Sequence, residues 1–171
     1  TLKTNGVQHF FIQPNKRFRL PAENKDMIMV GPGTGIAAFR SFLAERDATG
    51  ATGRNWLFFG EQHFVSDFLY QTEIQNWYET GVLTKVNLAF SRDQKEKIYV
   101  QHKMEEHAAE LYSWLQGGAS FFVCGKKDPM SVDVENTLIG IIVQQGNKTG
   151  AEAKHYLEQL EAEGRFEKDG Y

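Results

Sequence analysis

The residues best suited to chemistry come directly after apolar runs of the sequence. They are the glycine-rich run GPGTG at 31–35 and the pairs at 60–61, 91–92 and 124–125. Glycine lets a backbone approach a phosphate closely, and a guanidinium forms paired hydrogen bonds with phosphate oxygens. These residue types at the ends of apolar runs indicate a site for a phosphorylated ligand.

The GPGTG run lies between an apolar stretch over 26–30 and a stretch over 36–46 whose apolar residues recur at helical spacing. This pattern predicts a strand, a glycine turn and a helix. The free N–H groups at a helix start carry partial positive charge, and the Thr34 hydroxyl adds a donor, so the junction can bind a pyrophosphate. The run departs from the G-x-G-x-x-G fingerprint because Ile36 stands where the last glycine or alanine would fall. A purely structural turn is an equal alternative for this run taken alone.

A second anion site is predicted after the third apolar run. Ser91 and Arg92 pair a hydroxyl with a guanidinium, and Lys97 lies a few residues beyond. A ligand with a pyrophosphate and a second, distant phosphate fits two such sites, and NADP is such a ligand. The acid that binds the ribose of NAD at the end of the second strand has only Glu61 as a candidate, displaced by a glycine, which favours the 2′-phosphate form. A solvated charged loop over 91–97 is the alternative.

The elements that must position these residues alternate regularly. Strands are predicted over 26–30, 55–59, 85–90 and 120–124, and helices over 36–46, 66–79, 100–116, from Pro129 past Ile142, and 151–163. Ser66 and Asp67 are expected to cap the second helix and Pro129 to stand in a first helical turn. A strand over 6–12 and an extended segment over 14–21 precede them. The sequence therefore predicts an α/β fold, a doubly wound parallel sheet with helices on both faces.

Composition limits the function classes. The 171 residues are 41% hydrophobic and 24% charged, with a net charge of −3, which argues against a general nucleic-acid surface. The five histidines form no metal-ligand pattern, and no apolar segment reaches membrane-spanning length. A single cysteine, Cys124, fits a reducing compartment, so a cytoplasmic location is expected. The abrupt start at Thr1 suggests a module cut from a longer protein.

Several motifs in order resemble the NADPH-binding domain of diflavin reductases, and within that family the flavoprotein subunits of bacterial assimilatory sulfite reductase. The motifs are VGPGTGI at 30–36, AFSRD at 89–93, KIYVQ at 97–101, FVCG at 122–125, MSVDV at 130–134 and RFEKDGY at 165–171. The resemblance runs from about Phe18 to Tyr171. It implies the fold of ferredoxin-NADP reductase and a role in passing hydride from NADPH to FAD, then electrons through FMN to a sulfite reductase hemoprotein subunit.

The resemblance also implies roles for individual residues that contact NADP(H). Those expected at the pyrophosphate are Gly31, Gly33, Thr34 and Gly35; at the 2′-phosphate, Ser91, Arg92 and Lys97; near the adenine end, Ile98, Tyr99, Val100 and Gln101, with Asp133 as a further nucleotide contact.

At the reacting end the resemblance implies three further residues. Cys124 is expected beside the nicotinamide, Asp169 near the flavin, and Tyr171 stacked on the flavin ring. The alternative for Cys124 is a buried apolar filler, and for Tyr171 an ordinary chain end.

The sequence departs from the family pattern at Ala38, Lys126 and Gly170, where the family has a proline, an acid and a bulkier residue. Residues 1–21 are expected to be the tail of an upstream FAD-binding β-barrel, and residues 22–171 the NADP-binding domain. FAD- and FMN-binding domains of the same protein are therefore the expected partners. The alternatives are an NADP(H)-binding module without redox activity and a structural docking domain, which have no need for Cys124, Asp169 and Tyr171 at a flavin.

Overall fold

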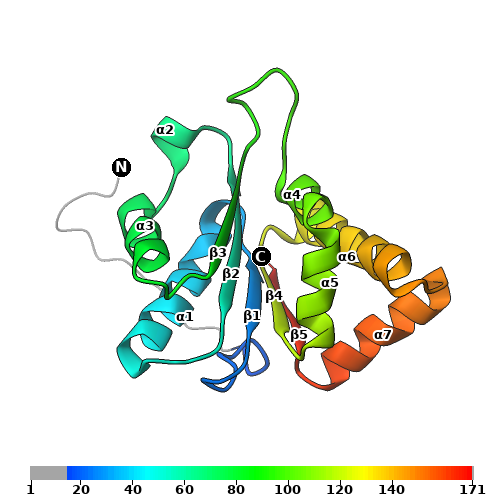
Figure 1. The fold of residues 1–171 in the computed structure, drawn as a ribbon. Helices are drawn as coiled ribbons and strands as arrows, with labels where there is room; N and C mark the ends of the chain where they lie inside the picture. The colour runs from blue at the N-terminus through cyan, green and yellow to red at the C-terminus, as the bar shows by residue number, and fades with distance from the viewer. Residues whose placement is uncertain (1–14, 171) are drawn as a thin grey trace, which may run out of the picture.

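The structure is a computed structural model that describes residues 15–170, so the predicted strand over 6–12 and Tyr171 lie outside the described part. Its centre is a parallel sheet in the order β3-β2-β1-β4-β5 (Figure 1). The strands are β1 (Met27–Val30), β2 (Asn55–Glu61), β3 (Lys85–Phe90), β4 (Ser120–Gly125) and β5 (Phe166–Gly170). The predicted α/β, doubly wound fold is confirmed. The strand β5 was not predicted, because its sequence FEKDG has no apolar run.

Helices cover both faces of the sheet (Figure 1). On one face lie α1 (Ile36–Thr49) and α3 (Gln71–Glu79); on the other lie α4 (Val100–Glu106), α5 (Ala108–Gln116), α6 (Val132–Gly146) and α7 (Gly150–Ala162). The chain adds strands outward from β1 to β3 and then crosses back to β4 beside β1. Right-handed crossovers in opposite directions place their helices on opposite faces. The order of strands therefore reverses between β1 and β4, which is where such sheets bind ligands.

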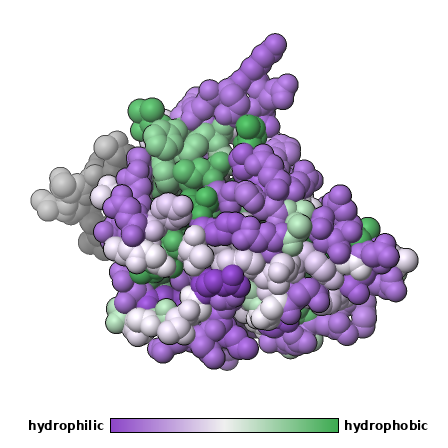
Figure 2. Space-filling model, viewed as in Figure 1, coloured by the Kyte–Doolittle hydropathy of each residue, from purple (hydrophilic) through white to green (hydrophobic). Residues whose placement is uncertain are grey.

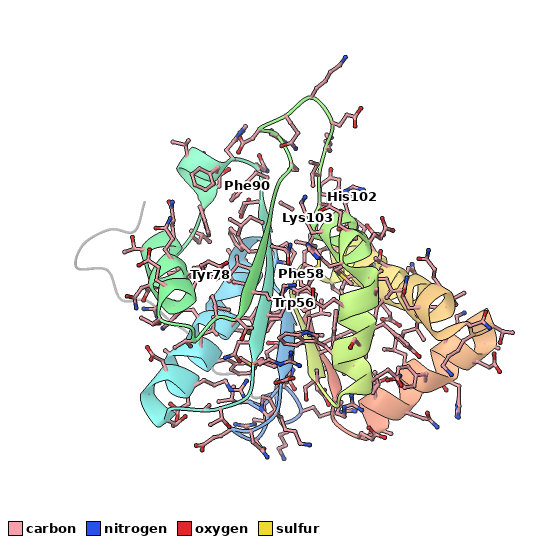
Figure 3. The ribbon with its side chains drawn as sticks, viewed as in Figure 1. Trp56, Phe58, Tyr78, Phe90, His102 and Lys103 are labelled. Atoms are coloured by element: carbon pink, nitrogen blue, oxygen red, sulfur yellow. The ribbon has the colours of Figure 1, made fainter. Side chains whose placement is uncertain are left out.

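The alternation of side chains along β1 divides the core in two. Met27 and Met29 pack toward α1 and α3, whereas Ile28 and Val30 pack toward the other helices. On the second face the rings of Trp56 and Trp114 are 5.2 Å apart, which fastens β2 to α5 (Figure 3). All four residues of β1 are fully buried, as expected for the central strand of a sheet covered on both faces.

The prediction of one helix over 66–79 is wrong for its first turn. A short helix, α2 (Phe64–Asp67), ends before a break at Tyr70, whose φ of 57° is left-handed, and α3 begins at Gln71. Phe68 stacks on Phe59 of the sheet with ring centroids 5.2 Å apart, and this contact turns the chain inward between the two helices. Ser66 and Asp67 therefore do not cap α3.

Two further helix predictions need correction. The helix over 100–116 is interrupted at His107, whose Nε2 lies 2.8 Å from Nδ2 of Asn87 on β3. Pro129 is not in the first turn of α6 but in an irregular turn over Lys127–Ser131. Asp128 before it is extended, as the residue before a proline prefers.

The described part of the segment before β1 packs on the domain. Phe18 contacts the rings of Phe39, Phe42 and Phe122, and the buried Arg46 binds backbone carbonyls in the segment that leads into β1. Within residues 15–170, no helix combines the length and apolar character needed to cross a membrane.

Candidate functional site

A cleft of about 490 Å³ opens where the carboxyl ends of the strands meet. Its lining comes from the ends of β1 to β4 and from the segments that follow them: Pro32, Gly33, Gly60, Glu61, Gln62, Ala89, Ser91, Arg92, Lys97, Tyr99, Val100, Gln101, Lys126, Pro129, Met130 and Asp133. This volume is in the range of small-molecule sites. Polar residues far apart in the sequence converge here because the strands are parallel and end at one edge.

The glycine turn after β1 forms the floor of the cleft near its helix. Gly33 has a left-handed φ of 61°, a conformation that a residue with a Cβ rarely adopts. A Cβ on Gly35 would lie 1.9 Å from the carbonyl oxygen of Cys124, so only glycine allows the turn to press against β4. Glycine is therefore required at position 33 by the backbone conformation and at position 35 by the packing.

The turn leads directly into α1, whose first backbone N–H groups have no helical acceptor within α1. The N–H of Gly35 bonds to the carbonyl of Pro32 at 3.2 Å, and the 3₁₀ turn Gly33–Gly35 tightens the approach. The N-terminal end of this 14-residue helix carries partial positive charge next to the cleft. The arrangement can stabilise a bound anion without a charged side chain.

The loop after β3 supplies the cationic side chains on the opposite wall of the cleft. Ser91, Arg92 and Lys97 line it together, and the loop projects from the sheet edge (Figure 1). Within residues 15–170, neither Arg92 nor Lys97 forms an ion pair, so their charges are available to a ligand. Such cations suit a phosphate group that is separate from the glycine turn.

The segment that follows this loop forms another part of the wall. Tyr99 and Gln101 line the cleft, and Tyr99 is 42% exposed, enough to offer its ring to a ligand. The N–H of Tyr99 donates to Nδ1 of His102 at 3.0 Å, which fastens the start of α4 (Figure 3). Ile98 packs against the core and does not line the cleft, whereas the buried Val100 contributes its edge.

Opposite charges also meet in the cleft. Glu61 and Asp133 bring carboxylates, and Lys126 adds a third cation beside Arg92 and Lys97. Sequence reasoning noted Lys126 only as a departure from the family and did not assign it to the site. Lys126 enters the cleft because it follows Gly125, whose φ of 145° redirects the chain at the end of β4.

Cys124 and Asp169 form a separate pair at the ends of β4 and β5. The two residues are register partners in the parallel ladder, so both side chains lie on the same face of the sheet. Burial, and to a lesser extent the negative charge of Asp169, raises the pKa of the Cys124 thiol to about 11. Nδ2 of Asn15 donates to Oδ1 of Asp169 at 3.1 Å, which holds the carboxylate in place.

The structure thus brings most of the predicted residues into one cleft. Those that line it are Gly33, Ser91, Arg92, Lys97, Tyr99, Val100, Gln101 and Asp133. Gly31, Thr34 and Gly35 belong to the same turn as Gly33 but do not line the cleft, and Cys124 and Asp169 lie at the neighbouring strand ends. Gln62, Pro129 and Met130 were missed, because nothing in their residue types marks them as contacts; only their positions after strand ends could have found them.

Comparison with known proteins gives the class of protein. The family described as the oxidoreductase NAD-binding domain matches residues 29–136, which is more than half of the chain. The chain therefore belongs to this family, and the matched range contains the glycine turn, the cationic loop and most of the cleft.

Individual relatives show which kind of protein within this family the chain is similar to. The chain is 54% identical over 162 residues to the sulfite reductase [NADPH] flavoprotein alpha-component of Bacillus subtilis (strain 168), which covers 94% of this chain and 27% of that protein. It is 48% identical over 171 residues to the protein of the same name from Serratia proteamaculans (strain 568), covering 99% of this chain and 28% of that protein. The resemblance inferred from the motifs is confirmed. The chain spans little more than a quarter of the length of these relatives.

Proposed function

We propose that this chain is the NADPH-binding module of a flavoprotein reductase, which positions NADPH for hydride transfer to FAD. The observation that carries the proposal is the cleft, in which the glycine turn at the start of α1 and the cationic loop after β3 form separate walls. Two anion sites on one ligand-sized cleft suit a dinucleotide with a pyrophosphate and a 2′-phosphate. The names of the relatives, which include NADPH and flavoprotein, support the same assignment.

The charges favour NADP(H) over NAD(H). Arg92 and Lys97 would hold the 2′-phosphate together with the hydroxyl of Ser91. Glu61 also lines the cleft and could accept hydrogen bonds from the free ribose hydroxyls of NAD. We expect the cations to favour the 2′-phosphate, because there both partners of each hydrogen bond are charged, whereas a ribose hydroxyl offers Glu61 only a neutral donor.

The remaining nucleotide contacts follow the wall of the cleft. The adenine end would lie by Tyr99 and Gln101 with Ile98 and Val100 behind them, and Asp133 would contact the nucleotide from the start of α6. The pyrophosphate would bind the turn formed by Gly31, Gly33, Thr34 and Gly35.

At the reacting end, bound NADPH supplies a hydride that FAD accepts, and the chain's own residues position and shield the reaction. Cys124 keeps its proton on Sγ at neutral pH because the raised pKa of its thiol disfavours the thiolate. A neutral thiol beside the nicotinamide places no second negative charge next to Asp169. Tyr171, by the resemblance, would stack on the flavin.

We extend the proposal to a longer protein of the relatives' kind, in which this chain would be one domain. FAD would be held mainly by an upstream β-barrel domain, of which residues 1–21 form the tail, and FMN by a further domain. A sulfite reductase hemoprotein subunit would be the final partner, in a cytoplasmic complex. The relatives' names support a flavin and a place in sulfite reductase only as properties of those longer proteins.

Calorimetric titration of the purified chain with NADP⁺ and NAD⁺ tests the proposal. Wild-type chain should bind NADP⁺ more tightly. Arg92→Ala should weaken NADP⁺ by about one to two orders of magnitude, since a hydrogen bond to a charged group is worth about 1.5–3 kcal/mol. NAD⁺ lacks the 2′-phosphate, so its affinity should stay the same. Equal losses for both nucleotides would assign Arg92 a structural role, and equal wild-type affinities would contradict the proposal.

A further inference from the structure

The loop that carries Arg92 and Lys97 projects from the domain with little packing of its own. In Figure 1 it rises above the end of β3, and in Figure 2 it forms a hydrophilic projection beside an apolar surface. Residues 92–97 are exposed. A long exposed loop pays a large entropic cost when a ligand fixes it, unless contacts within the protein hold it beforehand.

Asp93 makes such contacts at the base of the loop. Its Oδ2 accepts a hydrogen bond from the backbone N–H of Phe64 at 2.7 Å, and its Oδ1 lies 2.9 Å from Nδ1 of His63. The backbone hydrogen bond from Phe64, followed by the bond from His63, lowers the pKa of the Asp93 carboxyl, so the acceptor stays ionised at neutral pH. Both carboxylate oxygens are therefore engaged by the turn that follows β2.

The same two segments are joined along the backbone. The N–H of Ser91 donates to the carbonyl of Glu61 at 2.8 Å, and the N–H of Arg92 donates to the carbonyl of Gln62 at 2.9 Å. These bonds prolong the pairing of β3 with β2 beyond the end of the sheet. Asp93 closes this extension with its side chain, directly after the residue whose guanidinium lines the cleft.

The partner segment is itself held by a hydrogen bond and by aromatic contacts at the edge of the apolar core. The N–H of His63 donates to Oδ2 of Asp67 at 2.9 Å, and the ring of Phe64 meets the ring of Phe90 edge-on with centroids 5.3 Å apart. Phe68 lies 5.6 Å from both Phe64 and Phe90. The turn after β2 is thus a fixed base, and Asp93 connects the loop to it.

We infer that Asp93 is a positioning residue that fixes the cationic loop through Phe64 and His63, and thereby sets the preference for a 2′-phosphorylated nucleotide. This inference rests on the proposed function of Arg92. Asp93 acts through the loop and not as a ligand, because a carboxylate repels a phosphate and both of its oxygens already have donors.

Because Asp93 is negatively charged, a charge effect and a positioning effect predict opposite changes in NADP⁺ affinity when it is removed. Removal of a negative charge next to a phosphate site should strengthen phosphate binding if charge alone matters. Loss of the anchor should weaken it. We therefore expect Asp93→Ala to weaken NADP⁺ by about tenfold, the cost of two hydrogen bonds near the lower end of their net range.

The control is Glu96→Ala in the same loop. It removes the same charge, but Glu96 is exposed and its side chain forms no hydrogen bond or ion pair with the described residues 15–170. NADP⁺ affinity of this variant should be unchanged or slightly higher. His63→Ala removes one of the two anchoring bonds and should cost about threefold. Asp93→Asn keeps an acceptor for the N–H of Phe64 and should recover part of the affinity.

Calorimetry with NADP⁺ and NAD⁺ on the whole chain gives the readout, with unfolding in urea as a measure of folding. The expected result is a loss confined to NADP⁺ in Asp93→Ala and His63→Ala, with NAD⁺ unchanged. Equal weakening of both nucleotides, or unchanged NADP⁺ affinity in Asp93→Ala, would overturn the inference. A wild-type chain without preference for NADP⁺ would instead refute the proposed function, so the two failures are distinguishable.

Discussion

Cys124 carries the only thiol of the chain, and its surroundings keep that thiol protonated. It is 5% exposed at the end of a buried strand, and burial raises its pKa from its ordinary 9.0 to about 11. A thiolate is the reactive form of cysteine, so Cys124 is poorly suited to nucleophilic chemistry at neutral pH. Its surroundings suit a neutral thiol that packs beside a ligand.

The raised pKa makes a prediction about stability against pH. Below pH 9 the thiol is protonated in both the folded and the unfolded chain and adds no pH dependence. Between pH 9 and about 11 the unfolded chain loses this proton first, so the free energy of unfolding should fall as pH rises. Urea unfolding of the wild type and Cys124→Ala at pH 8 to 11 measures the difference. The difference in free energy of unfolding between the wild type and Cys124→Ala should change only above pH 9. A constant difference would contradict the raised pKa of Cys124.

At the scale of elements, the junction of β1, the glycine turn and α1 depends on close approach to β4. The turn can reach β4 only because Gly35 has no side chain, and this approach joins the strands on either side of the point where the sheet order reverses. The glycine turn is therefore a packing contact as well as a proposed anion site.

Gly35→Ala should accordingly destabilise the chain by about 1–3 kcal/mol or more, since the new Cβ would overlap backbone that cannot easily move. Gly140 in α6 is the matched control: a Cβ there meets nothing within 4 Å. Gly140→Ala should stabilise by about 0.5–1 kcal/mol through helix propensity. Urea unfolding of both variants measures the two free energies, and similar values for both would show that the approach to Cys124 is relaxed in solution.

At the scale of the whole molecule, the described residues form one domain with two apolar clusters on opposite faces of one sheet. The segment from residue 15 to β1 packs on this domain, since Phe18 contacts the cluster beside α1. Asn15 reaches across to Asp169, so the start of the described chain and its last strand meet near Cys124.

The purified chain should fold, bind NADP⁺ and carry no tightly bound flavin, because the proposed contacts of the nucleotide lie in the cleft, while FAD is expected to bind an upstream domain. Absorbance between 350 and 500 nm of the purified protein, together with a titration with FAD, measures this. A yellow, flavin-saturated protein would contradict the prediction and place flavin binding within these residues.

The sequence by itself determined the class of fold and predicted two anion sites. Apolar runs, helical spacing and the GPGTG turn are local signals, because each depends on residues that are neighbours in the chain. They were sufficient to place Ser91 and Arg92 at a strand end, and thus near the glycine turn. The family motifs extended this to Tyr99, Gln101 and Asp133, which do line the cleft.

Only the tertiary structure decided the features that depend on contacts between distant segments. The predicted helices are interrupted at Tyr70 and His107 because Phe68 and His107 contact the sheet. Helical periodicity in the sequence does not indicate these contacts. The strand β5 forms because β4 offers it a pairing edge, although its own sequence has no apolar run. The bond between His63 and Asp93 joins residues 30 positions apart, which no local pattern encodes. The sequence supplied the charged groups, and the parallel sheet brought them to one edge.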